Sequence, residues 1–249
     1  MIKPAVIIVG ADKGGVGKTT VSRTLLDYFS ARKVPIRAFD TESPKGTLKR
    51  FHPDVTEVVD INHVPDQMKI FDTINEVHLT LIDARAGSLS PTLRALRDIG
   101  FIDAAKRGQL TFAVFHILGP TIASLDEISD TASFLDEARY FLVKNLTNNS
   151  DHFFEWDQST YDSYFKKVPH AVEVTVPKLN EMACEQVELA SVPFLNFIAN
   201  KGPNGEAASY SFVLRGYVRH WLGNVWAEFD RVKLAETLSG PDMKTALAM

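Results

Sequence analysis

The sequence predicts an α/β fold, with a mostly parallel twisted sheet flanked by helices on both faces. Short apolar runs alternate with longer segments of helical periodicity, the pattern of parallel strands joined by crossover helices. Two of these runs end in aspartate, at the sheet edge where α/β proteins bind ligands. The predicted strands lie near residues 5–10, 36–40, 55–61, 78–83, 111–118, 139–144 and 171–176. The predicted helices include residues 19–32, 64–75, 121–137 and 179–190.

The composition agrees with one large domain. The 249 residues are 45% hydrophobic and 23% charged, enough to bury a substantial core. Because no repeat or linker-like stretch divides the chain, we expect a single domain over residues 1–249, whose C-terminal part, from about 205 to 249, is helical. The formal net charge of −4 argues against a surface coated with nucleic acid. The single cysteine, Cys184, cannot form an internal disulfide.

The ends of the chain carry no membrane signal. No basic-then-apolar export signal precedes the first predicted strand, and no run of about 18 apolar residues could span a membrane. The tail, residues 233–249, is interrupted by Ser-Gly-Pro and has few bulky apolar side chains, which makes it a poor amphipathic anchor. We therefore expect a cytoplasmic protein without a membrane role.

Residues 10–20 read Gly-Ala-Asp-Lys-Gly-Gly-Val-Gly-Lys-Thr-Thr and form a phosphate-binding motif. Glycines let backbone N–H groups point at phosphate oxygens, where Cβ atoms would block the approach. Lys18 is expected to reach the β- and γ-phosphates of a nucleotide, and the Thr19 hydroxyl to bind Mg²⁺. Apolar residues recur every four positions over 20–32, which predicts a helix whose positive N-terminus faces the phosphates. The expected nucleotide-binding residues are Gly14, Gly15, Val16, Gly17, Lys18, Thr19 and Thr20.

A second lysine, Lys13, precedes the paired glycines. The run 13–19, Lys-Gly-Gly-Val-Gly-Lys-Thr, resembles the deviant Walker A loop of the ParA/MinD family of SIMIBI-class P-loop ATPases. The resemblance implies that ATP and Mg²⁺ bind here and that two subunits form a homodimer with ATP sandwiched between them. It also implies that Lys13 reaches the partner's nucleotide, so that Lys13 and Lys18 are both catalytic. The alternative is that Lys13 is an ordinary solvated lysine.

The predicted strand 36–40 ends in Asp40, with Glu42 two positions later. The segment resembles the family's first switch, usually Asp-x-Asp followed by proline. Two carboxylates near the γ-phosphate can orient the attacking water or hold the water shell of a metal. Asp40 and Glu42 are therefore candidate catalytic residues, and Asp40 is also a candidate metal ligand. Because Glu replaces the second Asp and Pro44 comes one residue late, the sequence leaves open which carboxylate orients the water, and hydrolysis is expected to be slow.

Another predicted strand, residues 78–83, also ends in an aspartate, Asp83, and the residues that follow it are Ala-Arg-Ala-Gly. It is similar to the family's second switch, which implies that Asp83 binds Mg²⁺ through water and that the N–H of Gly87 senses the γ-phosphate. The alternative is that Asp83 is a helix cap, a common role for acids at strand ends. Arg85 stands where the family has a small residue or proline, and it is a candidate partner contact or catalytic accessory.

Two further positions match segments with which the family binds the base. Asn145 ends a strand-like run where the family has an Asn that reads the adenine edge, and Pro177 lies in a strand-proline segment near the base. Asn145 could equally form a turn. Adenine is favoured over guanine, because residues 200–203 resemble the guanine motif Asn-Lys-x-Asp but lack its Asp.

Two other regions are candidate interaction surfaces. The last predicted helix, about 208–229, has an apolar stripe expected to face the core: Phe212, Val213, Tyr217, Trp221, Leu222 and Val225. By resemblance to partition ATPases, the candidates for non-specific DNA binding are Arg215, Arg219, Arg231 and Lys233, although any solvated helix carries such residues. Aromatic residues crowd among acids in residues 150–165, as a docking surface or as a helix that packs on the core.

The sequence as a whole therefore predicts an ATPase that acts as a dimerising switch. Its hydrolysis, slow and stimulated by a protein partner, would drive the segregation or positioning of DNA or of another cargo. Among such proteins the chain looks closest to divergent plasmid members concerned with stability or conjugal transfer. Two alternatives remain: a P-loop kinase or ligase acting on a small molecule, and a nucleotide-bound scaffold with little turnover.

Overall fold

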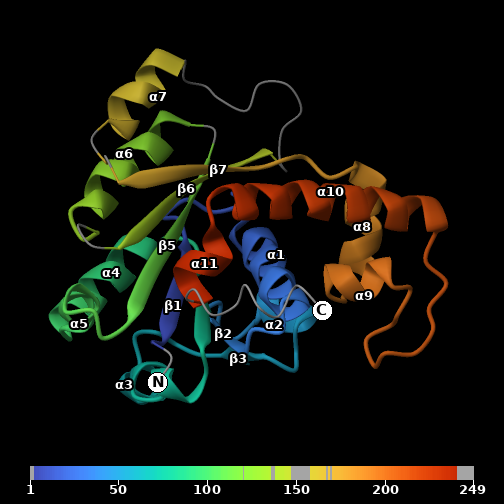
Figure 1. Cartoon of the computed structure of the whole chain (residues 1–249), viewed down its shortest axis with the longest axis horizontal. Coiled ribbons are helices and arrows are strands. Elements are labelled where there is room, and N and C mark those ends of the chain that lie inside the picture. Colours follow the sequence, from blue (N-terminus) through green and yellow to red (C-terminus); the bar gives the residue numbers. More distant parts are fainter. Residues whose placement is uncertain are drawn as a thin grey trace.

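A computed structural model describes residues 3–119, 121–135, 138–146, 158–166, 168 and 170–239. In these residues seven parallel strands form one sheet, in the order β3-β2-β4-β1-β5-β6-β7 (Figure 1). The strands are β1 (Ala5–Gly10), β2 (Ile36–Asp40), β3 (Thr56–Val58), β4 (Leu79–Asp83), β5 (Thr111–Leu118), β6 (Arg139–Asn145) and β7 (Ala171–Val176). The predicted α/β fold is confirmed, and every predicted strand is present.

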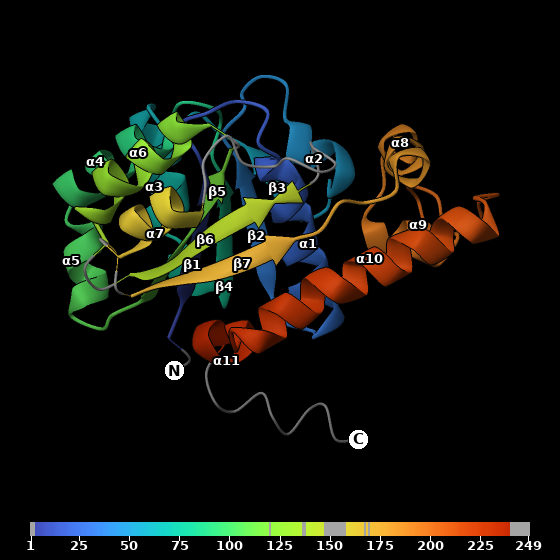
Figure 2. The same cartoon turned by 90° about the horizontal axis from the view of Figure 1, so that it is seen from above.

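Helices cover both faces of the sheet (Figure 2). On one side lie α1 (Lys18–Ala31), α2 (Thr47–Phe51), α8 (Glu181–Ala190), α9 (Phe194–Ile198), α10 (Phe212–Arg231) and α11 (Leu234–Ser239). On the other lie α3 (Val64–Phe71), α4 (Leu89–Asp98), α5 (Phe101–Lys106), α6 (Ile122–Ala132) and α7 (Gln158–Phe165), with a 3₁₀ turn at Ile74–Glu76. None of the described helices is long and apolar enough to cross a membrane.

The central strand β1 shows why its sequence is a continuous apolar run. Ile7 and Val9 point into the core beneath α1 and α10, whereas Val6 and Ile8 point into the core beneath α4 and α6. Successive side chains of a strand face opposite sides, so a strand covered on both faces has no polar position to alternate with. The two cores thereby place the carboxyl ends of β1, β2 and β4 at one edge of the sheet.

Element boundaries differ from the prediction where a turn or a cap intervenes. The strand expected over 55–61 is limited to Thr56–Val58, at the edge of the sheet. The helix expected over 179–190 begins at Glu181, because the Asn180 side chain accepts a hydrogen bond from the N–H of Ala183 at 3.1 Å and caps it. The helix expected over 64–75 ends at Phe71.

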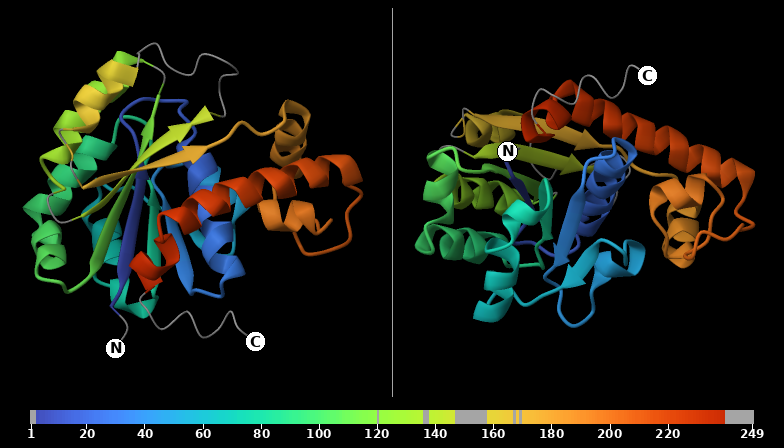
Figure 3. Two further views of the ribbon diagram at one scale, coloured as in Figure 1. Left: turned by 45° about the horizontal axis from the view of Figure 1, so that its top comes forward. Right: turned by 60° about the horizontal axis from the view of Figure 1, so that its bottom comes forward.

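The apolar stripe predicted along the last helix is only half correct. Trp221, Leu222 and Val225 are buried, but Phe212, Val213 and Tyr217 are 78%, 61% and 49% exposed. The physical reason is that the N-terminal half of α10 extends past the sheet to lie beside α8 and α9, so only its C-terminal half covers strands (Figures 2 and 3). In Figure 3 this helix is the long red one.

The aromatic segment predicted over 150–165 is described only from residue 158, and Phe153, Phe154 and Trp156 lie outside the described residues. In the described part, Tyr161 is buried and its hydroxyl donates to Glu173 at 2.6 Å. The Tyr164 hydroxyl donates to Asp126 at 2.7 Å. These contacts agree with the second of the two interpretations given for this segment, in which its helix packs against the rest of the protein.

Candidate functional site: a phosphate loop between two switches

The glycine loop leaves the end of β1 and enters α1 directly. Gly15 and Gly17 have φ angles of +73° and +87°, a conformation that side chains with a Cβ seldom adopt. Val16 between them is 6% exposed and anchors the loop in the core. The first turn of α1 contains no acidic residue, so the positive end of the helix is open to an anion. The loop borders a cavity of about 280 Å³.

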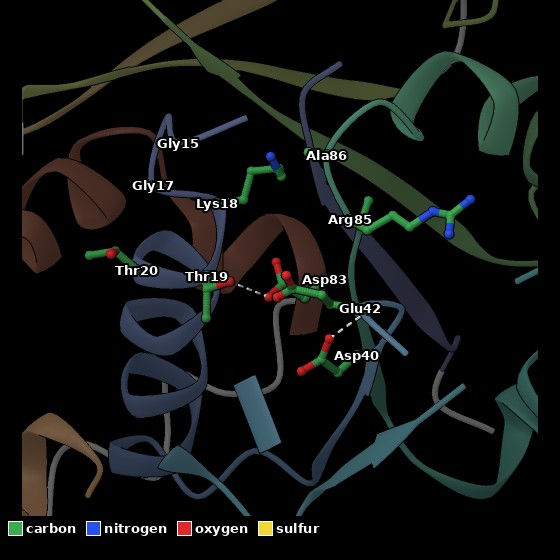
Figure 4. A pocket seen from close by; sticks show the side chains of 11 residues that line it. Gly15, Gly17, Lys18, Thr19, Thr20, Asp40, Glu42, Asp83, Arg85 and Ala86 are labelled. Atoms are coloured by element: carbon green, nitrogen blue, oxygen red, sulfur yellow. Dashed lines mark hydrogen bonds between the residues drawn. The ribbon is translucent and has the colours of Figure 1, made fainter. Parts of the chain in front are cut away.

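Lys18 extends across this cavity (Figure 4). Its Nζ donates to the carbonyl oxygen of Lys13 at 3.0 Å, so the loop folds over its own lysine. Burial lowers the pKa of the Lys18 ammonium below its ordinary value, and the charges of Asp83 and Glu127 oppose that effect. A phosphate would supply the negative charge that this buried cation lacks.

Asp83 lies at the bottom of the cavity, at the end of β4. The Thr19 hydroxyl donates to one of its carboxylate oxygens at 2.9 Å (Figure 4). The Ser22 hydroxyl donates to the other at 2.8 Å. Burial, and then the charge of Asp40, raise the pKa of Asp83 to about 7. Asp40 is its register partner on β2, which brings the two strand-terminal acids side by side.

These groups fit a magnesium ion that is shared with a nucleotide. A buried carboxylate beside a hydroxyl is the donor set that Mg²⁺ uses when phosphate oxygens and water complete its shell. Among the described residues no three His, Cys, Asp or Glu side chains form a cage for a metal by themselves. Thr19 and Asp83 are therefore the residues that would hold the ion.

Asp40 holds the first switch in shape. One of its oxygens accepts the N–H of Glu42 at 2.9 Å, and the other accepts the N–H groups of Leu48 and Lys49 at 2.6 and 3.3 Å. The carboxylate therefore fixes the turn at residues 41–46 and caps α2. Glu42 also lines the cavity, and its carboxylate accepts a hydrogen bond from the Thr47 hydroxyl.

Thr41, which the sequence motifs did not single out, links the two switches. Its N–H and its hydroxyl both donate to the carbonyl of Asp83, at 3.0 and 3.1 Å. The same hydroxyl accepts the N–H of Arg85 at 2.9 Å. Because Thr41 is 4% exposed, these bonds are shielded from water, and they join the two segments directly. The sequence feature that could have pointed to this residue is its position between the two acids of the first switch, Asp40 and Glu42.

Gly87 and its neighbour Ala86 bring the second switch against the phosphate loop. Gly87 has a φ angle of +75°, and a Cβ placed there would approach the carbonyl of Asp12 at 3.8 Å. A Cβ on Gly14 would lie 3.6 Å from that of Ala86. Both distances are ordinary van der Waals contacts, so the two segments touch, and it is the positive φ angle of Gly87 that favours glycine there.

The predicted dimer lysine, Lys13, is held within its own subunit. Its Nζ donates to the Thr121 hydroxyl, just before α6, at 2.6 Å. The preceding Asp12 accepts the N–H and hydroxyl of Ser90, and its own N–H donates to Glu127 at 3.0 Å. The loop is therefore tied to α4 and α6 by contacts that no sequence motif indicates.

Asn145 lies beneath the loop. Its side-chain amide donates to the carbonyl of Val16 at 2.9 Å, and the residue is 2% exposed. Pro177 lies at the end of β7, where its carbonyl accepts the Trp221 indole N–H at 2.6 Å. The expected reading of an adenine edge by Asn145 stays a prediction, whereas its support of the loop is visible.

A second cavity, of about 270 Å³, opens between α1 and α8 and shares Thr20 with the first. Lys178, Cys184 and Trp221 contribute to its walls. At its base Arg23 is 2% exposed, is stacked between the rings of Phe51 and Phe194, and pairs with Glu188 at 2.5 Å. Phe51 is the last residue of α2, the helix that follows the first switch. This arginine therefore connects that helix to α8.

The candidate DNA-binding residues do not form one free basic face. Arg231 is bound to Glu228 at 2.9 Å and to the carbonyl of Glu173, and Arg215 is half-buried with a guanidinium N–H directed at the carbonyl of Ile198. Arg219 and Lys233 are exposed.

Comparison with known proteins supports the fold by structure alone. No protein-family model matches the chain, and no curated protein matches it by sequence. A ParA family ATPase from Chlorobium tepidum is similar with a TM-score of 0.54 and 12% identity, over 88% of this chain and 98% of that one. The septum site-determining protein MinD from Pyrococcus horikoshii, complexed with Mg-ADP, has a TM-score of 0.51 and 16% identity, over 76% and 86%.

The chain therefore shares its fold with a ParA family ATPase and with MinD, as the resemblance of its two-lysine loop predicted.

Proposed function

We propose that this chain is an ATP-dependent switch, which dimerises around bound ATP and Mg²⁺ and separates after slow hydrolysis. The observation that carries the proposal is the meeting of a two-lysine phosphate loop with two strand-terminal aspartates at one cavity, where Thr41 links both switches. The shared fold with a ParA family ATPase and MinD supports it.

The residues of the first cavity have different roles in this proposal. Lys18 and the N–H groups of the loop bind phosphates, while Thr19 and Asp83 hold Mg²⁺, which neutralises phosphate charge when bound. Of the two acids in the first switch, Asp40 is occupied by three backbone N–H groups, whereas Glu42 accepts from one side chain. Glu42 is therefore the better candidate to orient the attacking water, and Asp40 a positioning residue.

The second cavity is the proposed place of the nucleoside. It continues from Thr20, the residue that follows the metal-binding threonine, and so begins where the α-phosphate would lie. Pro177 directly precedes Lys178, which lines this cavity, whereas Asn145 is buried beneath the loop and would have to be uncovered to read an adenine edge.

DNA is the proposed cargo, and the cytoplasm the expected place of action. Arg219 and Lys233 are the exposed basic residues on and after α10, and dimerisation would double their number. Each phosphate contact steepens the dependence of log affinity on log salt by about 0.9. We expect ATP-dependent DNA binding whose salt slope decreases in Arg219→Ala. Binding without salt dependence would favour a protein cargo.

The proposal is tested by measuring mass in solution with light scattering, alongside phosphate release, in ADP and in ATP with Mg²⁺. We expect ATP to double the mass of the wild type and Lys13→Ala to abolish the doubling or the hydrolysis. The control is Lys33→Ala, which removes an exposed lysine beyond the end of α1.

Other outcomes identify the alternatives. A chain that stays monomeric with ATP and hydrolyses it only with an added metabolite is a kinase or ligase. A dimer that forms with ATP and releases no phosphate is a scaffold. Either result contradicts the proposed switch.

A further inference from the structure

Arg85 lies at the rim of the phosphate cavity and is not explained by the residues that bind phosphate or metal. It lines the cavity, yet its side chain is exposed. Figure 4 shows the side chain leaving the second switch on the side away from Lys18 and Asp83. The Arg85 guanidinium therefore does not point towards the phosphate-binding residues of its own subunit.

The backbone of Arg85 is fixed although its side chain is not. Its N–H donates to the buried Thr41 hydroxyl at 2.9 Å, and its carbonyl accepts the Ser88 hydroxyl at 2.7 Å. No described residue forms an ion pair or hydrogen bond with its guanidinium. The backbone of Arg85 is thus held by hydrogen bonds, while its charged side chain extends from the surface.

The nearest electrostatic partner is weak. The N–H of Asn62 holds the pKa of Asp60 below its ordinary value, and the charge of Arg85 adds a smaller effect. Asp60 is fully exposed, so water screens this attraction. Little free energy opposes movement of the guanidinium to a stronger anion.

We propose that Arg85 acts in trans: in the ATP dimer its guanidinium contacts the γ-phosphate of the partner subunit's ATP and stabilises the transition state of hydrolysis. This inference rests on the proposed face-to-face dimer. A side chain at the rim that points out of its own site points towards the facing subunit when a two-fold axis brings the two rims together.

The chemistry requires no other reactant. Water attacks the γ-phosphorus, the bond from that phosphorus to the β–γ bridging oxygen breaks, and ADP, phosphate and a proton are released. Arg85 stays protonated throughout, and its fork of donors matches the phosphoryl oxygens, where charge is spread in the transition state. Coupling through Thr41 would place Arg85 only when the first switch is closed.

The first test compares phosphate release from Arg85→Ala, Arg85→Lys and the control Arg107→Ala, an exposed arginine next to α5. We expect Arg85→Ala to slow hydrolysis about 100-fold or more, as loss of a catalytic arginine does, while ATP still doubles the mass and the affinity for ADP is unchanged. Arg85→Lys should recover only part of the rate, because an ammonium cannot make the bidentate contact.

The second test distinguishes action in trans from action in cis by mixing two inactive variants. Arg85→Ala retains its own site, and Glu42→Gln retains Arg85 and Lys13; if Glu42→Gln alone keeps turnover, Asp40→Asn replaces it. Equal mixing should restore about a quarter of the wild-type rate, because half of the dimers are mixed and one site in each is complete.

Absence of recovery on mixing, with both variants dimeric, overturns action in trans. A wild-type rate in Arg85→Ala overturns the role altogether while leaving the switch intact. If wild-type protein fails to double its mass with ATP, the proposed function and this inference both fail, so the mass measurement separates the two.

Discussion

The two cavities that share Thr20 are built in different ways. We call the first, formed by the β1–α1 loop and the ends of β2 and β4, the phosphate half, and the second, between α1 and α8, where the nucleoside is proposed to bind, the nucleoside half. In the phosphate half, Asp40 and Asp83 end adjacent strands, and Asp40 is held by backbone N–H groups that follow it closely in the chain. In the nucleoside half, the walls come from helices more than 150 residues apart in the chain.

The two cavities differ in how precisely their side chains must be placed. Phosphate and metal demand exact placement, which short contacts to strand ends provide. The nucleoside half depends in addition on how α8 and α10 pack against α1. Arg23 lines the second cavity and contacts Phe51, at the end of the α2 helix that Asp40 caps, as well as Glu188 of α8. Four variants or reagents test this contrast.

The largest effect is expected for Asp83→Asn, which removes from the phosphate half the carboxylate proposed to hold Mg²⁺. Mg²⁺-dependent hydrolysis should fall at least about 100-fold. Burial raises the pKa of Asp83 from 3.8 to about 7, so the charged form destabilises the fold. That penalty grows as pH rises from about 4 and is complete above about 7, so the nucleotide-free variant should be more stable than wild type by roughly 1–3 kcal/mol at pH 8.

Urea unfolding at pH 4 and pH 8 measures this stability difference, with Asp54→Asn, an exposed acid, as the control. At pH 4 the difference should nearly vanish, because the wild-type carboxyl is then protonated in the folded state. A variant that is less stable than wild type at pH 8 contradicts the assignment of Asp83 as a destabilising buried charge.

The next effect concerns Thr41, whose hydroxyl couples the switches within the phosphate half. Thr41→Val keeps the shape but leaves the partly buried N–H of Arg85 without its acceptor, a loss of about 1 kcal/mol. We expect single-turnover phosphate release to slow about 10-fold with little change in ADP affinity. Thr41→Ser, which keeps both hydrogen bonds, is the matched control. An equal loss of ADP affinity would show that Thr41 supports binding only.

Asn145→Ala decides whether that residue belongs to the phosphate half or to the nucleoside half. If its main role is the hydrogen bond to Val16, affinity for ADP and for pyrophosphate should fall together, by roughly 5- to 20-fold. Calorimetric titration with both ligands measures this, with Asn75→Ala as an exposed control. A loss confined to ADP would assign Asn145 to the base instead.

The smallest effect probes the nucleoside half through its cysteine. Cys184 is the only cysteine in the chain and lines the second cavity. ADP should slow its alkylation by about 3- to 10-fold, and pyrophosphate should not, because only a nucleoside fills that cavity. Burial raises the pKa of the thiol above its ordinary value of 9.0, so the rate should keep rising between pH 7 and 9. Equal protection by pyrophosphate would place the nucleoside elsewhere.

Much of this site could be predicted because its features are local. Glycines with positive φ, a helix that starts at Lys18, and acids at the ends of apolar strands are all specified by residues close in the chain. Register then brings Asp40 beside Asp83 without further information. By contrast, the exposure of Phe212 and Val213 could not be predicted, since it depends on how far α10 extends past the sheet.

The order of strands and helices along the chain, and the phosphate loop, could be predicted from sequence alone, because periodicity and backbone conformation are short-range properties. Which group pairs with each charged side chain depends on tertiary packing: backbone N–H groups for Asp40, two hydroxyls for Asp83, Thr121 for Lys13 and Glu188 for Arg23. A polar group that leaves water must find a partner wherever the fold provides one, and for Asp83, Lys13 and Arg23 that partner lies 60 or more residues away.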